Sequence, residues 1–297
     1  MINYEIFSDS SSNLNDDTID NLQLNVVSLV YIINGEEFNS YVKGADNSKK
    51  AFFERLKNKE EITTSCINEQ TFIEAFEPTL QAGKDLLYIG FSSGVSNTYN
   101  CGANACKNLQ AKYPSRKIIA VDTLSGSLGE GLIVNNACEM RLNGSTIEDV
   151  ASYVENVRLN VIHVFTVEDL YWLYKGGRIN RSTFLIGSIA KIKPIMDINN
   201  EGKIVSAGKS LGRKKSIIDM ANIISKSIVN PEEQIVYISH GDCFEDVELL
   251  EKKILEKIQV KGFYVNDVDQ VMGVHAGPGL LGAYFVGGER HQIKKLF

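Results

Sequence analysis

A short stretch of the chain, Gly90–Tyr99, gathers serines and glycines directly after the apolar run Leu86–Ile89, which predicts a buried strand. Gly90, Ser92 and Gly94 have the Gly-x-Ser-x-Gly spacing of the nucleophile elbow of serine hydrolases, in which the serine attacks an acyl group. The same residue types at a strand-to-helix turn can instead hold an anion, because backbone N–H groups and the positive end of the helix dipole converge there. The stretch therefore predicts either a reacting serine or a binding cradle.

A serine hydrolase also needs an acidic residue and a histidine base, in the chain order serine, acid, histidine. Asp242 and His275 follow Ser92 in that order. However, no His-Gly-Gly-Gly segment precedes the turn to complete an oxyanion hole, and so short a spacing arises easily by chance. The hydrolase is therefore the alternative to a binding function.

Hydroxyl-rich segments follow successive apolar runs in the first half of the chain. They occupy residues 8–12, 63–65, 92–96 and 123–127. Apolar runs that alternate with helical patterns predict a largely parallel sheet with helices on both faces, and Ser65 is the expected N-cap of a helix over residues 69–81. Ligands bind outside the carboxyl ends of the strands in such sheets, so the four segments predict one shared polar site.

The second half of the chain follows a predicted helix that ends near Arg158, and its pattern is different. Between Lys175 and Lys215 it carries ten basic and two acidic residues, a local charge of +8. A β-rich terminal piece contains the segment His275–Gly279. We therefore expect an α/β domain over residues 1–158 and an α+β domain over residues 159–297.

Composition argues against several classes of protein. The 297 residues are 43% apolar and 23% charged, typical of a soluble globular protein, and a net charge of −6 gives no support to nucleic-acid binding. Five cysteines without a Cys-x-x-Cys pair indicate reduced thiols, and four scattered histidines predict no metal site. The chain shows neither a signal-peptide pattern nor an apolar run of membrane-helix length, so we expect a cytoplasmic protein.

Eight short motifs occur in order over nearly the whole chain. They are Asp9–Leu14, Thr64–Ser65, Ser92–Tyr99, Asp122–Gly131, Asp169–Leu170, Lys175–Ile179, Ser239–Asp242 and His275–Gly279. Each alone is weakly specific, but the eight in register resemble the DegV family, the fatty-acid-binding subunits also called FakB. The sequence departs from the family where Cys66-Ile67-Asn68 replaces a proline-containing turn and where Ala276 replaces a threonine.

The resemblance implies a two-domain protein that buries one long-chain fatty acid at the domain interface and presents it to a separate fatty acid kinase, which phosphorylates the carboxylate. It implies that the carboxyl group is bound by Thr64, Ser93, Arg178 and His275. Supporting positions would be Ser65, Ser92, Gly94, Ser125 and Gly277. It also implies no catalytic residue, no cofactor besides the bound fatty acid, a role in phospholipid synthesis, and transient contact with a membrane.

Neutral hydroxyls suit a carboxyl group, because they can donate to a carboxylate or accept from a protonated acid without burying a fixed charge. The guanidinium group of Arg178 could bind a carboxylate or a phosphate through two parallel hydrogen bonds. Alternatively, Gly176-Gly177 is simply a helix C-cap and Arg178 is a cation close to that helix end. The surrounding basic stretch predicts a docking surface for an acidic partner. Apolar candidates for a tunnel wall are Phe165, Phe184, Leu185, Ile186, Ile189, Ile192, Ile195 and Met196.

Overall fold

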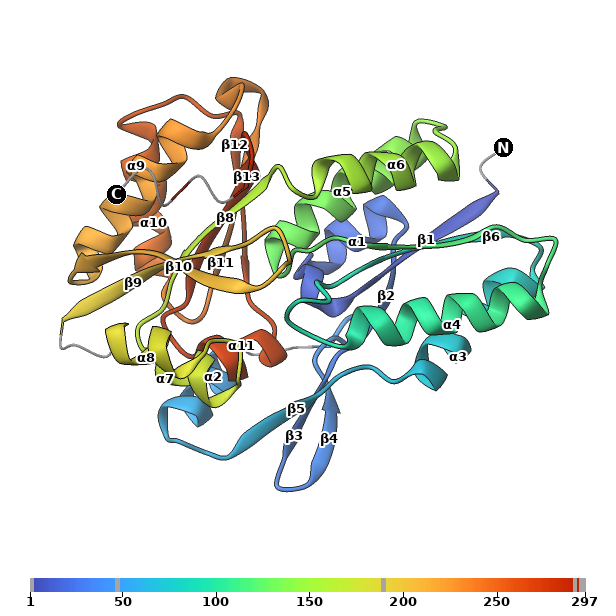
Figure 1. The fold of residues 1–297 in the computed structure, drawn as a ribbon, viewed down its shortest axis with the longest axis horizontal. Helices are drawn as coiled ribbons and strands as arrows, with labels where there is room; N and C mark the ends of the chain where they lie inside the picture. The colour runs from blue at the N-terminus through green and yellow to red at the C-terminus, as the bar shows by residue number, and fades with distance from the viewer. Residues whose placement is uncertain (1–2, 46–48, 188–190, 291–292, 294–297) are drawn as a thin grey trace.

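The structure is a computed structural model that describes residues 3–45, 49–187, 191–290 and 293. Among these residues, the strands form a four-stranded parallel sheet (sheet A), a three-stranded antiparallel sheet (sheet B) and a six-stranded mixed sheet (sheet C) (Figure 1). Sheet A is built from residues before 123 and sheet C from residues after 160. This architecture confirms the predicted class, an α/β fold with a second, mixed-sheet part.

Sheet A has helices on both of its faces (Figure 1). Its strands in spatial order are β2 (Asn25–Val27), β1 (Tyr4–Asp9), β6 (Asp85–Gly90) and β7 (Ile118–Asp122). One face packs against α1 (Asp16–Leu22), α5 (Leu128–Leu142) and α6 (Ile147–Val157), and the other packs against α3 (Glu69–Gln81) and α4 (Thr98–Lys112). Successive strand residues point to opposite faces, so Leu87 joins the first of these cores and Tyr88 joins the second.

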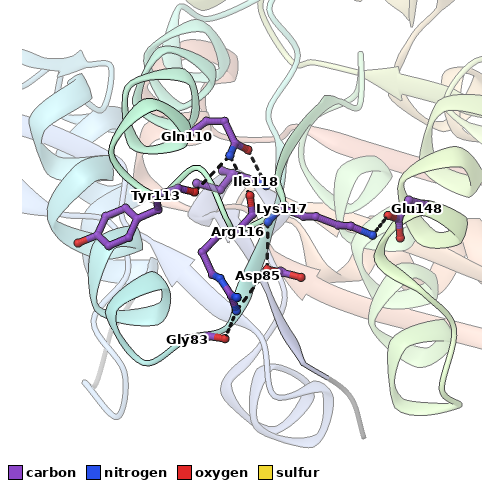
Figure 2. A network of polar contacts seen from close by, with 8 residues as sticks. All are labelled: Gly83, Asp85, Gln110, Tyr113, Arg116, Lys117, Ile118 and Glu148. Carbon is purple, nitrogen blue, oxygen red and sulfur yellow. Dashed lines mark hydrogen bonds and ion pairs between the residues drawn. The ribbon is translucent and has the colours of Figure 1, made fainter.

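The turn between α4 and β7 is held by a network of polar contacts (Figure 2). Gln110 Nε2 donates to the backbone carbonyls of Tyr113 at 3.3 Å and Arg116 at 2.8 Å. The Lys117 amide donates to Asp85 Oδ1 at 3.0 Å, which joins the start of β7 to the start of β6. The network therefore aligns the two strands at their amino ends, away from the serine-rich loops at their carboxyl ends.

Sheet B lies beside sheet A and changes two predictions. Its strands in spatial order are β4 (Glu36–Asn39), β3 (Val30–Ile33) and β5 (Ile62–Ser65). Residues 63–65 therefore lie within a strand of sheet B and not in a turn at the carboxyl end of sheet A. Asn68 caps α3, since its Oδ1 accepts from the Thr71 amide at 2.9 Å, so the prediction of Ser65 as the N-cap is wrong.

Sheet C is built from the second half of the chain. Its strands in spatial order are β10 (Ile204–Leu211), β9 (Ile192–Ile198), β8 (Val161–Thr166), β13 (Leu281–Val286), β11 (Ile235–His240) and β12 (Gly262–Asp267). Helices α9 (Arg213–Ser227) and α10 (Phe244–Leu255) pack against one face. Ile162 and Val164 of β8 point to that face, and the alternate residues His163 and Phe165 line a cavity on the other.

Short helices connect these sheets. They are η1 (Ser10–Ser12), α2 (Lys49–Lys57), α7 (Tyr171–Lys175), α8 (Arg181–Gly187), η2 (Pro231–Glu233) and α11 (Gln270–Ala276). The predicted β-rich terminal piece contains β12 and β13, but His275 lies on α11, because the Asp269 carboxylate accepts from the Met272 amide at 2.7 Å and starts a helix there. In the described parts of the chain, no helix is both long and apolar enough to cross a membrane.

Candidate functional site

A cavity of about 470 Å³ lies between β5, α7, α11, the loops that follow β6 and β7, and the inner face of sheet C. Its apolar lining residues include Leu29, Ile62, Phe91, Phe165, Leu173, Ile198, Ile204, Val271, Met272 and Leu280. Its polar lining residues include Thr63, Thr64, Ser65, Ser96, Asn97, Ser127, His163, Lys175, Arg178 and His275. The volume is within the range of roughly 300–1,000 Å³ for small-molecule sites, and the lining suits a ligand with a long apolar part and one polar group.

Thr64 and His275 meet at this cavity, although 211 positions separate them in the chain. Thr64 Oγ1 lies 2.8 Å from His275 Nε2, which brings together the end of β5 and the end of α11. Burial, with a contribution from the Arg178 guanidinium, lowers the pKa of His275 to about 3, so the imidazole is neutral near pH 7. In the described structure His275 Nδ1 is buried and has no hydrogen-bond partner.

Arg178 completes the polar group that we call the Thr64 site, which consists of Thr64, Arg178 and His275. A Cβ atom on Gly176 would lie 2.2 Å from His275 Nδ1, so the missing side chain lets the end of α7 approach the imidazole. Arg178 is half-buried, and one of its amino groups donates to the Gly176 carbonyl. Burial lowers the pKa of Arg178, and no carboxylate pairs with it among the described residues. An anionic ligand would supply the missing negative charge.

The serine loop, which follows β6, contributes residues to the cavity lining that differ from the predicted ones. Ser92 is buried, and its hydroxyl donates to the Gly202 carbonyl at 2.8 Å and accepts from the Gly94 amide at 3.2 Å. Ser93 has an exposed side chain, and its amide donates to the Asp122 carboxylate at 3.3 Å. Ser92, Ser93 and Gly94 are absent from the described cavity lining. The residues that this loop contributes to the lining are Val95, Ser96 and Asn97.

The hydrolase alternative requires Ser92, Asp242 and His275 to contact one another. Ser92 instead donates to Gly202, Asp242 forms an ion pair with Lys57 at 2.6 Å, and His275 contacts Thr64. Within the described residues, no hydrogen bond joins Ser92 to either of the other two. This arrangement therefore gives the Ser92 hydroxyl no base.

The other supporting positions are divided between the cavity and its frame. Ser65 lines the cavity. Ser125 is buried, and its hydroxyl accepts from an amino group of Arg290 at 2.7 Å. Gly277 ends α11 with φ +77°, and a Cβ atom there would lie 2.1 Å from Cδ1 of Trp172. Glycine at this position therefore allows α11 to turn tightly against α7, which keeps His275 beside Gly176.

The hydroxyls at residues 8–12 do not share the cavity. Ser8 Oγ donates to Glu130 Oε1 at 3.0 Å and Ser11 donates to the other carboxylate oxygen, while Asp9 accepts from the Tyr88 hydroxyl at 3.1 Å. We call these five residues the Glu130 network. Glu130 is 0% exposed, and burial raises its pKa well above the usual value. The predicted single polar site therefore excludes this segment, because Ser8 and Ser11 donate to a buried carboxyl group and Ser10 contacts Ser40 at 2.9 Å.

Sequence reasoning missed part of the cavity lining. Ser96, Asn97 and Ser127 belong to recognised motifs, so motif membership was the available signal for them. His163 and Tyr284 are cross-strand partners on β8 and β13, a register that no local pattern indicates. Among the apolar tunnel candidates, Phe165 lines the cavity and Ile195 and Met196 lie in hydrophobic cores, whereas Ile189 is outside the described residues.

Comparison with known proteins identifies the family. A family model described as DegV, a family of uncharacterised proteins, matches residues 3–287. A DegV domain-containing protein of Clostridium perfringens is 37% identical over 289 residues, which cover 97% of this chain and 98% of that protein. The solved structure of DegV from Bacillus subtilis, described as a fatty acid binding protein, is 25% identical with a TM-score of 0.82, over 97% of this chain and 100% of that one. A structure described as fatty acid binding of a DegV family protein from Thermus thermophilus has a TM-score of 0.86 at 24% identity, over 96% of this chain and 100% of that one. The chain therefore belongs to the DegV family.

Proposed function

We propose that this protein binds one long-chain fatty acid in the cavity, with the carboxyl group at the Thr64 site. The observation that carries the proposal is a half-buried arginine without a carboxylate partner in the described chain, placed beside a neutral histidine and a largely apolar cavity. The description of the Bacillus subtilis relative as a fatty acid binding protein supports the same ligand class.

The Thr64 site can bind a carboxylate through a short relay. In one tautomer, His275 Nε2 donates a hydrogen bond to Thr64 Oγ1. The Thr64 hydroxyl can then donate its own hydrogen bond to a ligand oxygen. Arg178 then supplies the positive charge that a neutral imidazole lacks. The family resemblance also implies Ser93, but its side chain is exposed and outside the described cavity lining, so in this proposal its hydroxyl adds little to retention of the ligand.

The apolar tail supplies most of the affinity. About fourteen methylenes at ~0.8 kcal/mol each give a gross transfer free energy of ~11 kcal/mol, before the entropic cost of binding. A hydrogen bond to a charged group contributes a net ~1.5–3 kcal/mol. The polar residues therefore set the orientation of the ligand, and the cavity wall holds it.

We further propose that the bound acid is presented to a separate fatty acid kinase in the cytoplasm and so supplies acyl chains for phospholipid synthesis. A carboxylate oxygen would attack the γ-phosphorus of ATP, and ADP would leave. The basic stretch Lys175–Lys215, with its charge of +8, supports docking of an acidic partner beside Arg178. Brief contact with a membrane would allow loading of the acid.

Native mass spectrometry of the freshly purified protein tests the binding proposal. We expect one long-chain fatty acid per chain, or stoichiometric uptake after oleate or palmitate is added to delipidated protein. Absence of both would contradict fatty-acid binding.

The kinase step has its own test. Loaded protein, a fatty acid kinase and MgATP should yield an acyl phosphate that hydroxylamine traps as a hydroxamate. Arg178→Ala should reduce the yield, and loaded wild-type protein that gives no hydroxamate with an active kinase would contradict presentation. A fluorophosphonate probe tests the hydrolase alternative, since a binding protein stays unlabelled at Ser92.

A further inference from the structure

Two of the five cysteines meet at the rim of the cavity. Cys66 follows the last residue of β5 directly, is exposed, and is one of the lining residues. Cys101 lies in the first turn of α4 and is partly exposed. Burial, together with the neighbouring Cys66 thiol, raises the pKa of Cys101.

Other contacts hold the two segments that carry these cysteines. Asn97 Nδ2 donates to Cys101 Sγ at 3.5 Å, and Asn97 lines the same cavity as Cys66. The helices that follow and carry the two cysteines are also joined, because Asn108 of α4 donates to Glu69, the first residue of α3, at 2.5 Å. The segments that carry the two cysteines are therefore held together at the rim of the cavity.

The other three cysteines are less accessible to an oxidant than Cys66. Cys106 and Cys138 are buried, and burial raises the pKa of each to about 12. Cys243 is partly exposed, its thiol donates to the Leu280 carbonyl at 3.1 Å, and burial raises its pKa to about 11. Cys66 is the exposed thiol of the five, so a soluble oxidant meets it first.

We propose that Cys66 and Cys101 form a peroxide-sensitive dithiol that closes to a disulfide at the cavity rim. The Cys66 sulfur attacks an oxygen of hydrogen peroxide, the O–O bond breaks, and the released hydroxide leaves as water with the Cys66 proton. The Cys101 sulfur then attacks the sulfenic sulfur, the S–O bond breaks, and the second hydroxide leaves as water with the Cys101 proton. Two thiols lose two electrons in total, and one peroxide becomes two waters.

The disulfide joins the turn after β5 to the start of α4. Thr64 lies two residues before Cys66, so the bond restrains the strand end that carries the Thr64 hydroxyl. Exchange of a ligand past this rim is slower in the oxidised protein, and a thiol reductant restores the faster exchange. This effect on exchange rests on the proposed fatty-acid binding, whereas formation of the disulfide does not.

Peptide mapping of the full chain tests the modification. Reduced protein, freed of reductant, is treated with hydrogen peroxide, alkylated with iodoacetamide and digested without reduction. We expect a peptide pair joined through Cys66 and Cys101, a loss of two alkylatable thiols per chain, and recovery of both after dithiothreitol. Two outcomes in the wild-type protein would overturn the proposal. One is oxidation of Cys66 to the sulfinic acid, and the other is a disulfide from Cys66 to Cys243 or to a second chain.

Matched variants separate the pair from general oxidation. Cys243→Ser should form the joined peptides as the wild type does, whereas Cys66→Ser should not. Cys101→Ser should accumulate a sulfenic acid on Cys66 that dimedone traps, because the resolving thiol is gone. Dimedone labelling of wild-type Cys66 that equals the labelling in Cys101→Ser would overturn the role of Cys101.

Release of a fluorescent fatty acid from reduced and oxidised wild-type protein then tests the consequence. We expect several-fold slower release after oxidation, reversed by dithiothreitol. Equal rates would overturn the coupling to exchange. Failure of the reduced protein to bind the probe at all would instead overturn the proposed function, and the peptide map would still decide whether the disulfide forms.

Discussion

Two hydroxyl-rich regions of this molecule use their hydroxyls in different ways. In the Glu130 network, Ser8 and Ser11 donate to a fully buried carboxyl group, so donor and acceptor are both inside the protein. In the Thr64 site, the Thr64 hydroxyl contacts a neutral imidazole, and Arg178 has no carboxylate partner among the described residues. The first region is complete without a ligand, and the second lacks an anion.

The difference shows what a hydroxyl-rich segment in a sequence can indicate. Buried polar groups require partners, and the partner can be a distant side chain just as well as a ligand. Only the balance of donors, acceptors and charge separates the two cases. The Glu130 network is therefore expected to contribute to stability and the Thr64 site to binding, and the predictions below test that separation.

The largest expected effect is on stability, from Glu130→Ala. The substitution removes the acceptor of the Ser11 hydroxyl and leaves a void in a fully buried position. We expect the free energy of unfolding to fall by about 3 kcal/mol, with little change in the affinity of the folded protein for ligand. Urea unfolding followed by circular dichroism measures the loss. Glu139→Ala, on the exposed side of the same helix, is the control and should change stability by less than about 0.5 kcal/mol.

The pH dependence of stability should separate the two regions by sign. His275 has its pKa lowered to about 3, so between that value and about pH 6.5 the unfolded chain binds a proton that the folded chain does not, and stability rises with pH. Glu130 has its pKa raised well above its usual value, so the folded chain binds the extra proton and stability falls as pH rises above about 4.5.

Two conservative variants isolate these contributions. Between about pH 4 and about pH 7, His275→Gln should reduce the rise in the free energy of unfolding by about 3 kcal/mol, because it removes the group whose titration makes the folded protein more stable at higher pH. Glu130→Gln should change the same difference in the opposite direction. Urea titrations at the two pH values measure both, and a change of the same sign in both variants would contradict the comparison.

The local sequence pattern was sufficient to predict the long helices and strands but not the short ones. The predicted helix over residues 69–81 has the bounds of α3, and the predicted strand Leu86–Ile89 lies within β6, because both elements bury many apolar side chains. Helix α11 has seven residues, too few to show that period, and its N-cap Asp269 was the remaining signal. The role of residues 63–65 depended on which sheet β5 joined, and pairing with β3 is a tertiary choice.

The candidate site was predictable only as a set of separate motifs. The contact between Thr64 and His275 arises because sheet B and α11 pack together, which no spacing along the chain encodes. In the serine loop, the contact of Ser92 with Gly202 turns the loop so that Ser96 and Asn97 face the cavity. Which serine of a loop meets the cavity is therefore decided by its partner across the fold.

Thr64→Ala tests the binding side of the comparison. It removes the hydroxyl that joins His275 to the ligand but leaves the strand intact, so we expect about tenfold weaker retention of fatty acid and a change in unfolding free energy below about 1 kcal/mol. A fluorescent fatty acid displacement titration measures retention. Thr79→Ala, a half-buried threonine on α3 outside the cavity lining, should retain wild-type affinity. A stability loss equal to that of Glu130→Ala would show that Thr64 is structural.

The smallest expected effect comes from Ser93→Ala. Its amide, which the substitution keeps, makes the contact with Asp122, and its hydroxyl is exposed and outside the described cavity lining. We therefore expect less than about a twofold change in retention in the same displacement titration, well below the effect of Thr64→Ala. A tenfold loss would mean that the loop after β6 turns Ser93 onto the bound carboxyl group. Binding of the ligand would then add Ser93 to the Thr64 site, because the Ser93 hydroxyl has no acceptor among the described residues and can donate to the carboxylate without losing another hydrogen bond.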